Sequence, residues 1–208
     1  MTSKRIDLFR NGLVLLLLVG GVFSVAQEST TALLLTKRFV GAAILHLEGG
    51  PNSIDIDGDA ASDVAFRAYR PNFNAHGYTL VTFYRKTVDS DGVQSWELVP
   101  FVGANGQEHA SFESREGADC RLSGIVALRE DKSVGTPVTV IEAERDAGDS
   151  SADPMKVTFT VFRLSRNDEQ ISGWPNVYFK ETETLVSREL HCDVGRAIET
   201  ELDIVHAV

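Results

Sequence analysis

The amino-acid sequence predicts an all-β protein built as an antiparallel β-sandwich. Segments in which apolar and polar residues alternate recur along the chain, and they are rich in Val, Thr, Phe and Tyr. Clusters of Gly, Asp, Asn or Pro separate these segments. Before the C-terminal region no helical period lies between them, and strands at this density without helices are typical of a sandwich.

The first 26 residues have the pattern of a secretory signal peptide. Basic residues near the start precede an apolar stretch at 13–25, and the small residues Ser-Val-Ala lie directly before Gln27. The stretch is shorter than the roughly 20 residues that a transmembrane helix needs. We therefore expect cleavage after residue 26, export to the periplasm and no stable membrane span afterwards. A retained N-terminal anchor is the alternative.

The mature chain, residues 27–208, has a length that suits one β-sandwich domain. The whole chain has 20 Lys and Arg against 30 Asp and Glu. The expected signal contains three of the basic residues and one of the acidic residues, so the mature chain has 17 basic and 29 acidic residues. An acidic protein gains nothing from counterion release at phosphates, so nucleic acid is not an expected partner. Ordinary solubility of an exported protein accounts for the charge.

Seven segments are expected to be strands. In chain order they cover residues 64–69, 78–86, 93–101, 120–128, 137–144, 155–164 and 177–186. The turn signal Asp89-Ser-Asp-Gly92 lies between the second and the third of them. These two segments are therefore expected to pair as a β-hairpin.

One helix is expected near the C-terminus. Asp193 is a suitable N-cap, because its carboxylate can accept a hydrogen bond from a free N–H of the first turn. Val194, Ile198, Leu202 and Val205 follow at helical spacing and share one face.

The chain has two cysteines, Cys120 and Cys192. An exported protein meets an oxidising compartment, so we expect them to pair. Closing a loop of about 73 residues would stabilise the fold by roughly 4 kcal/mol on the chain-entropy model, and would staple the helix to the strand that begins at Cys120. Two buried free thiols are the alternative. A zinc site is not indicated, because neither cysteine has a second one within a few residues.

An acidic loop follows residue 54. Its carboxylates, Asp55, Asp57, Asp59 and Asp63, stand at positions 1, 3, 5 and 9 of a short stretch. Repulsion and desolvation would raise their pKa values. Calcium is held by alternate oxygen ligands of tight loops, so we predict a structural calcium site here. A solvated acidic turn is the alternative. Without metal, Asp57→Ala is expected to stabilise the fold slightly by relieving the repulsion.

This loop is not an EF-hand. The twelfth position is Phe66, where an EF-hand has a bidentate Glu, and the sixth is Ala60, where it has Gly. The spacing before an apolar strand resembles the calcium hairpin of integrin-type propeller repeats. Those repeats come in series and this chain has one copy, so the resemblance is to the loop alone.

Signatures of exported hydrolases are absent from the sequence. No serine is followed three residues later by a lysine, and neither Lys-Thr-Gly nor Gly-x-Ser-x-Gly occurs. The five histidines never pair at the short spacings of zinc hydrolases. We therefore expect no enzyme activity and no catalytic residue. A dispersed triad is the alternative.

Two polar clusters are candidates for a ligand or partner surface. They contain Asn72, Asn74 and His76 in the first and Arg145, Asp146 and Asp149 in the second. The first lies between two expected strands, where its side chains can instead cap backbone groups of a turn. The second lies at a strand end, where the arginine can instead pair with the carboxylates.

The succession of motifs resembles a known family. In order they are Asn-x-Ile-Asp-x-Asx-Gly-Asp at 52–59, Asn-Phe-Asn-Ala-His at 72–76, Gly-Ala-Asp-Cys at 117–120, Arg-Asp-x-Gly at 145–148, Tyr-Phe at 178–179 and His-Cys-Asp-Val at 191–194. Over most of the mature chain this order is similar to that of the carbapenem intrinsic-resistance, or CarG-type self-resistance, proteins.

The resemblance implies an exported β-sandwich with short terminal helices, similar in fold to bacterial inhibitors of invertebrate-type lysozyme. It also implies a homodimer with a bound cation, and protection against a simple carbapenem without hydrolysis. One departure is Ser150-Ser-Ala-Asp153, where Ser-Tyr-Ala-Asp is expected in the family. It weakens any transfer of that loop's role to this chain.

Two classes of function follow. In the first, the protein is a non-catalytic binding protein of the envelope that shields cell-wall synthesis from a β-lactam ligand. In the second, it blocks the cleft of a hydrolase, an envelope protein partner, with a protruding loop at 146–154. Such a loop needs an exposed, stiff tip with Ser, Tyr and Gly, and the Tyr is missing here. An enzyme with an unrecognised dispersed site is a third option.

Overall fold

The structure is a computed structural model that describes residues 38–73, 77–115, 120–133 and 135–204. The expected signal peptide and the expected start of the mature domain lie outside these ranges, so both remain predictions. Within the described ranges, no helix is long and apolar enough to cross a membrane.

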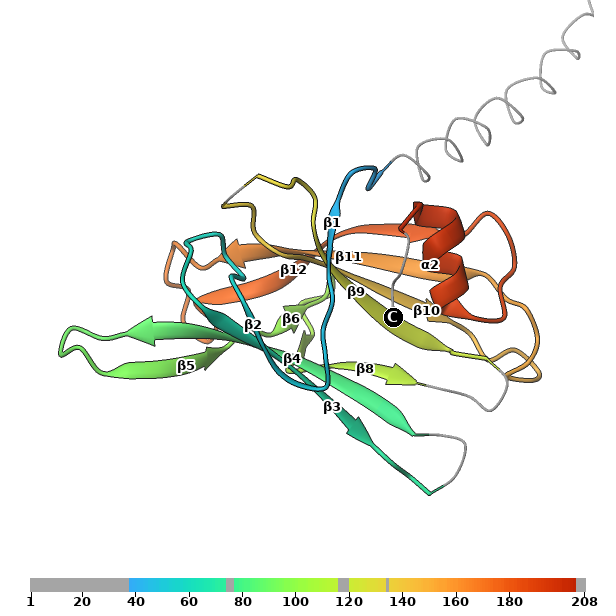
Figure 1. Cartoon of the computed structure of the whole chain (residues 1–208), viewed down its shortest axis with the longest axis horizontal. Helices are drawn as coiled ribbons and strands as arrows, with labels where there is room; N and C mark the ends of the chain where they lie inside the picture. The colour runs from blue at the N-terminus through green and yellow to red at the C-terminus, as the bar shows by residue number, and fades with distance from the viewer. Residues whose placement is uncertain (1–37, 74–76, 116–119, 134, 205–208) are drawn as a thin grey trace, which may run out of the picture.

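Two β-sheets pack against each other, and one short helix, α2, lies on the larger sheet (Figure 1). The larger sheet has the order β1 (Ala43–Leu45), β9 (Ser123–Arg129), β10 (Thr139–Arg145), β11 (Val157–Arg166), β12 (Val177–Val186), β6 (Phe101–Val102) and β7 (Glu108–His109). The smaller sheet has the order β2 (Gly50–Ile54), β3 (Asp63–Arg70), β4 (Tyr78–Val88) and β5 (Gln94–Leu98), and β8 (Phe112–Arg115) also pairs with β4. The predicted all-β sandwich is confirmed.

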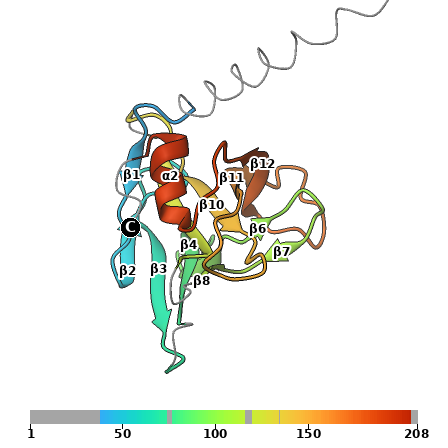
Figure 2. The same ribbon diagram turned by 90° about the vertical axis from the view of Figure 1, so that its right-hand side faces the viewer.

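The pairing is antiparallel throughout except between β12 and β6, which run parallel. The expected hairpin is confirmed, since β4 pairs with β5. Figure 2 shows the two edges of the larger sheet, β1 and β6–β7, on opposite sides of the molecule. Sequence patterns did not predict β1, β2, β7 and β8, because strands of two to five residues are too short to establish a period.

The expected single strand at 93–101 is wrong, because the chain crosses between the sheets at Pro100. Before it, the Val99 N–H donates to the Phe83 carbonyl of the smaller sheet at 2.8 Å. The Pro100 carbonyl itself accepts from the Phe179 N–H of the larger sheet, also at 2.8 Å. Proline has no N–H to continue a ladder, so the strand divides here into β5 and β6.

The core has two layers because alternate residues of a strand face opposite sides of a sheet. On β10, Ile141 and Ala143 face the helix, whereas Val140 belongs to the cluster between the sheets. In that cluster the rings of Phe83 and Phe179 meet edge to face at 5.1 Å. The strands β9, β10 and β11 of the larger sheet are therefore covered on both faces, whereas β12 and β7 carry exposed residues.

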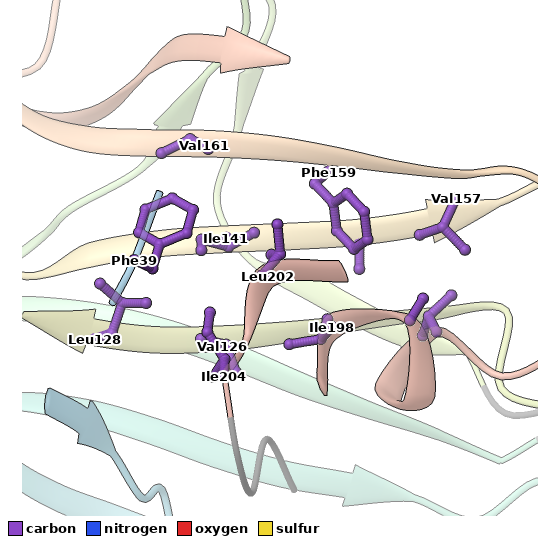
Figure 3. Packing of buried hydrophobic residues seen from close by; sticks show 13 residues of the cluster. Phe39, Val126, Leu128, Ile141, Val157, Phe159, Val161, Ile198, Leu202 and Ile204 are labelled. Carbon is purple, nitrogen blue, oxygen red and sulfur yellow. The ribbon is translucent and has the colours of Figure 1, made fainter. Parts of the chain in front are cut away.

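Helix α2 (Val194–Leu202) covers the outer face of the larger sheet. Figure 3 shows its Ile198 and Leu202 against Ile141 and Phe159 of the strands beneath. These apolar positions are the ones that the helical spacing predicted. The fourth predicted position, Val205, lies outside the described residues. The N-terminal helix that the family resemblance implies would also lie outside them.

A hydrogen bond and a disulfide fix the start of α2. The side chain of Asp193 accepts a hydrogen bond from the Arg196 N–H at 3.1 Å, as expected of the N-cap. The predicted disulfide between Cys120 and Cys192 is confirmed, with the two Cα atoms 5.4 Å apart. The helix is therefore linked covalently to the segment that leads into β9.

The other end of α2 is held by Glu201, whose side chain is almost fully buried. Its carboxylate accepts from Arg188 Nε at 2.8 Å and from the Glu189 N–H at 3.0 Å, and it is hydrogen-bonded to His191 Nε2 at 3.0 Å. Burial raises the pKa of Glu201, but these donors outweigh it and lower the pKa to about 2. The ionised carboxylate thus ties the helix to the segment 187–191.

Candidate functional site

The acidic loop connects β2 to β3 and packs against the connection between β9 and β10. Arg129 Nη2 donates to the Asp55 carbonyl at 2.7 Å, and the Val138 N–H donates to the Ile56 carbonyl at 2.8 Å. Gly58 has a φ of 81°, and a Cβ there would lie 2.1 Å from the carbonyl oxygen of Gly135. Only glycine fits this turn, so the loop is held in one conformation by its neighbour.

Backbone N–H groups of the loop itself satisfy most of its carboxylate oxygens. Asp55 accepts from the Gly58 N–H at 2.7 Å and from the Ala60 N–H at 3.2 Å. Asp59 accepts from the Ala61 N–H at 2.7 Å. Such local bonds are typical of turns built by aspartate.

Asp57 is paired with two arginines from different sheets. Its buried Oδ2 accepts from Arg85 Nε of β4 at 2.9 Å and from Arg166 Nη2 of β11 at 2.7 Å. Burial raises the pKa of Asp57, but the charges and hydrogen bonds of these arginines and the Asp59 N–H outweigh it, so the pKa lies below 3.8. The expectation of a raised pKa is therefore wrong for Asp57, because two cations neutralise it.

Asp63 behaves as expected. Burial raises its pKa most, and the charges of Asp57 and Asp59 raise it further, although the N–H groups of Lys86 and Ile56 act against both. Those two N–H groups donate to Asp63 at 2.9 and 3.0 Å. Repulsion within the loop therefore raises the pKa of Asp63, which has no cationic side chain as a partner among the described residues, and not the pKa of Asp57, which has two.

Three of the four predicted calcium ligands lie close together. Asp55, Asp57 and Asp63 each offer one carboxylate oxygen, and these oxygens lie within 4.8 Å of one another. Asp59 is not part of this group. Oxygen donors of this kind suit a hard cation such as Ca²⁺, although the two arginines on Asp57 already supply positive charge at the same place. Calcium binding therefore stays a prediction, and the two arginines would compete with the ion for the Asp57 carboxylate.

The second predicted surface is organised by Arg145, which is buried. Its Nε donates to the Cys192 carbonyl at 2.6 Å, and its two Nη atoms donate to the carbonyls of Asp146, Ser151 and Asp153. Among the described residues, all hydrogen bonds of its guanidinium go to backbone oxygens of the segment 146–153 and of Cys192. The residue that the sequence suggested as ligand-facing thus shapes the loop around it.

Asp146 and Asp149 are exposed on that loop. Asn72 is half-buried at the end of β3, whereas Asn74 and His76 lie outside the described residues. The acidic loop and the 146–153 loop lie at opposite ends of the sandwich (Figure 1). The structure therefore contains two separate candidate regions.

Sequence reasoning missed Arg85 and Arg166, the partners of Asp57. They lie 28 and 109 residues away from it along the chain, and each stands in an ordinary alternating strand. Only the pairing of the two sheets brings them to the loop. No local motif in the sequence marks them.

Comparison with known proteins shows the fold. The structure is similar to the crystal structure of CarG, with a TM-score of 0.58 and 20% sequence identity over 77% of this chain and 98% of that chain. No family model and no curated protein sequence matches the chain. The chain thus has a CarG-like fold, which agrees with the order of motifs in its sequence.

Proposed function

We propose that this chain is an exported, non-catalytic binding protein that protects the cell envelope from a β-lactam of the carbapenem class. The observation that carries the proposal is the likeness to CarG, which extends over nearly the whole of that chain although few residues are identical. The motifs at 52–59, 145–148 and 191–194 support it, because they stand in the loops that organise the two ends of this fold.

Binding without turnover is supported by how the charged residues of these motifs are used. The Asp57 carboxylate is neutralised by two arginines, and the Arg145 guanidinium is used by backbone carbonyls. A general acid or base needs a free proton-accepting or proton-donating position within reach of a substrate. These two groups instead hold their loops in shape, as expected of a binding protein.

The survival of a carbapenem-sensitive host tests this proposal. Cells that export the protein should grow at carbapenem concentrations that stop cells with an empty vector. A variant without residues 1–26, which stays in the cytoplasm, is the matched control and should give no protection. Equal growth of exporting and control cells at every concentration would reject the proposal.

The 146–153 loop favours a second candidate, an inhibitor that blocks a hydrolase cleft. Residues 146–150 are exposed, and the hydrogen bonds of Arg145 make the loop stiff. An inhibitory loop requires both properties, since ordering a loop on binding costs affinity. Inhibition of an invertebrate-type lysozyme by the purified protein, lost in Asp149→Ala, would support this candidate against the first.

We also propose that the protein forms a homodimer through the outer face of the smaller sheet. Phe66, Trp96 and Leu98 share this face and are 42%, 53% and 37% exposed. Exposed apolar surface of this kind is typical of interaction sites. In light scattering the wild type should be a dimer and Trp96→Ser a monomer. Trp174→Ser, at an exposed tryptophan outside this face, should stay dimeric; a monomeric wild type would contradict the proposal.

A further inference from the structure

A cavity of about 370 Å³ lies between the two sheets, away from both loop regions. Its walls come from β4, β6, β7, β8, β10 and β11. The lining includes Phe101, Phe112, Phe162, His109, Ser111 and Glu142. The lining thus joins an aromatic wall to several polar and charged side chains, and the volume falls within the usual range of small-molecule sites.

The apolar wall of the cavity is aromatic. Phe101, Phe112 and Phe162 are each at least nine-tenths buried, and all three belong to the cluster between the sheets. The rings of Phe101 and Phe162 meet edge to face at 5.3 Å, which fixes their orientation. The wall is therefore preformed, and aromatic faces of this kind attract cations as well as apolar groups.

Glu142 is the acidic group of the cavity. It lies two residues from Val140 on β10, so it shares the face that looks toward the smaller sheet. Among the described residues, none donates a hydrogen bond to its carboxyl group. Arg115 lines the same cavity, but its guanidinium is paired with Glu144. The half-buried carboxyl group therefore lacks a direct partner.

The charges around the cavity are mainly negative. Glu113 of β8 lines the same cavity, and Glu144 of β10 and Glu181 of β12 act on Glu142 with like charge. Arg115 is the one lysine or arginine among the described residues of the lining, which also includes His109 of β7. A ligand that carries a carboxylate would be repelled by this arrangement. A positively charged ligand would neutralise it.

We propose that this cavity binds an organic ammonium ion, with the charged nitrogen at Glu142 and an apolar body against the three phenylalanine rings. This goes beyond protection from a β-lactam and does not depend on it. The ammonium group would supply the hydrogen bonds that the carboxyl group lacks, and the rings would add apolar and cation–π contact.

The pH dependence of binding follows from the position of Glu142. Burial raises its pKa most, Glu144 and Glu181 raise it further, and Arg115 lowers it, with a result of about 7. The carboxyl group is therefore mostly protonated at pH 6 and mostly ionised at pH 8. An alkylammonium ion keeps its charge over this range, so its affinity should rise with pH.

Titration calorimetry on the mature protein tests the proposal with three probes that share one ring: benzylamine, benzyl alcohol and benzoate. Benzylamine should bind most tightly, at least fivefold more so at pH 8 than at pH 6. Glu142→Gln should weaken it at least tenfold and leave benzyl alcohol unchanged. Glu169→Gln, which removes an exposed charge elsewhere, should have no effect. A short lysine peptide as a fourth probe distinguishes a free amine from a protein side chain as the ligand.

Two results would overturn the proposal. One is benzylamine that binds no better than benzyl alcohol, while the lysine peptide does not bind at all. The other is benzoate that binds to the wild type as tightly as benzylamine does. The second result needs no variant, so it decides the question even if Glu142→Gln does not fold.

Discussion

Asp57 and Arg145 are buried charged residues that organise loops at opposite ends of β11, and their charges are satisfied in different ways. Asp57 at one end has two arginine partners, one of which is the last residue of β11. Arg145 at the other end pairs in register with Val157, the first residue of β11, and binds only backbone carbonyls.

The difference shows which end can respond to its surroundings. A carboxylate neutralised by arginine side chains can exchange them for a metal ion, and it loses its charge in acid. An arginine bound by carbonyls keeps its charge at every pH of interest, and carbonyls do not titrate. We therefore expect the Arg145 end, with its disulfide, to be the more rigid and the Asp57 end to be the adjustable one.

The largest effect should come from the disulfide at the Arg145 end. Replacing both Cys120 and Cys192 by Ala should lower the free energy of unfolding by about 4 kcal/mol, since the unfolded chain gains a long open loop. Urea unfolding measures this loss, and reduction of the wild-type protein should reproduce it. Unchanged stability in both experiments would show that the bond does not constrain the chain.

Arg145→Met should follow, with a loss of about 3 kcal/mol, because several buried carbonyl groups lose their donor while the apolar stem is kept. The loss should be the same from pH 4 to pH 8. Arg196→Met provides a control, because among the described residues the side chain of Arg196 makes only an exposed i,i+3 pair with Glu199, so the change should alter stability by less than about 0.5 kcal/mol. An equal effect of the two substitutions would contradict the role given to Arg145.

Much of the fold was predictable from the sequence, whereas part of the candidate functional site was not. The long strands and α2 carry clear periods, and the expectation of export made the Cys120–Cys192 pairing a reasonable prediction. The pairing of Asp57 with Arg85 and Arg166 was not predictable, because it depends on how the two sheets are stacked. For the same reason Glu142 looked like an ordinary strand residue, although it faces the cavity between the sheets.

Asp57→Asn should lower stability by about 2 kcal/mol at pH 7, since Arg85 and Arg166 lose their counter-charge. This reverses the slight gain expected from the sequence for removal of this carboxylate. The folded-state pKa lies below the reference value of 3.8, so the contribution of Asp57 is complete above that value and is lost as the pH falls through the folded pKa. Denaturant unfolding of both proteins between pH 7 and pH 2 should show the difference shrink in acid. Glu201 titrates in both proteins and cancels in this comparison.

The smallest effect should be that of calcium. If Asp55, Asp57 and Asp63 bind it, a free concentration of about ten times the dissociation constant adds about 1.4 kcal/mol to the free energy of unfolding by mass action. Melting temperature against calcium and against chelator measures this gain, and Asp57→Asn should abolish it. The same response in both proteins, or none in the wild type, would contradict calcium binding at these three carboxylates.

The central claim, binding of a carbapenem without hydrolysis, is tested most directly by equilibrium dialysis of a simple carbapenem against the purified mature protein. The absorbance of the β-lactam ring is followed in both chambers during the experiment. We predict excess intact carbapenem on the protein side, up to one molecule per binding site, with ring opening no faster than in buffer. Equal concentrations in the two chambers, or ring opening in proportion to the protein present, would contradict the claim.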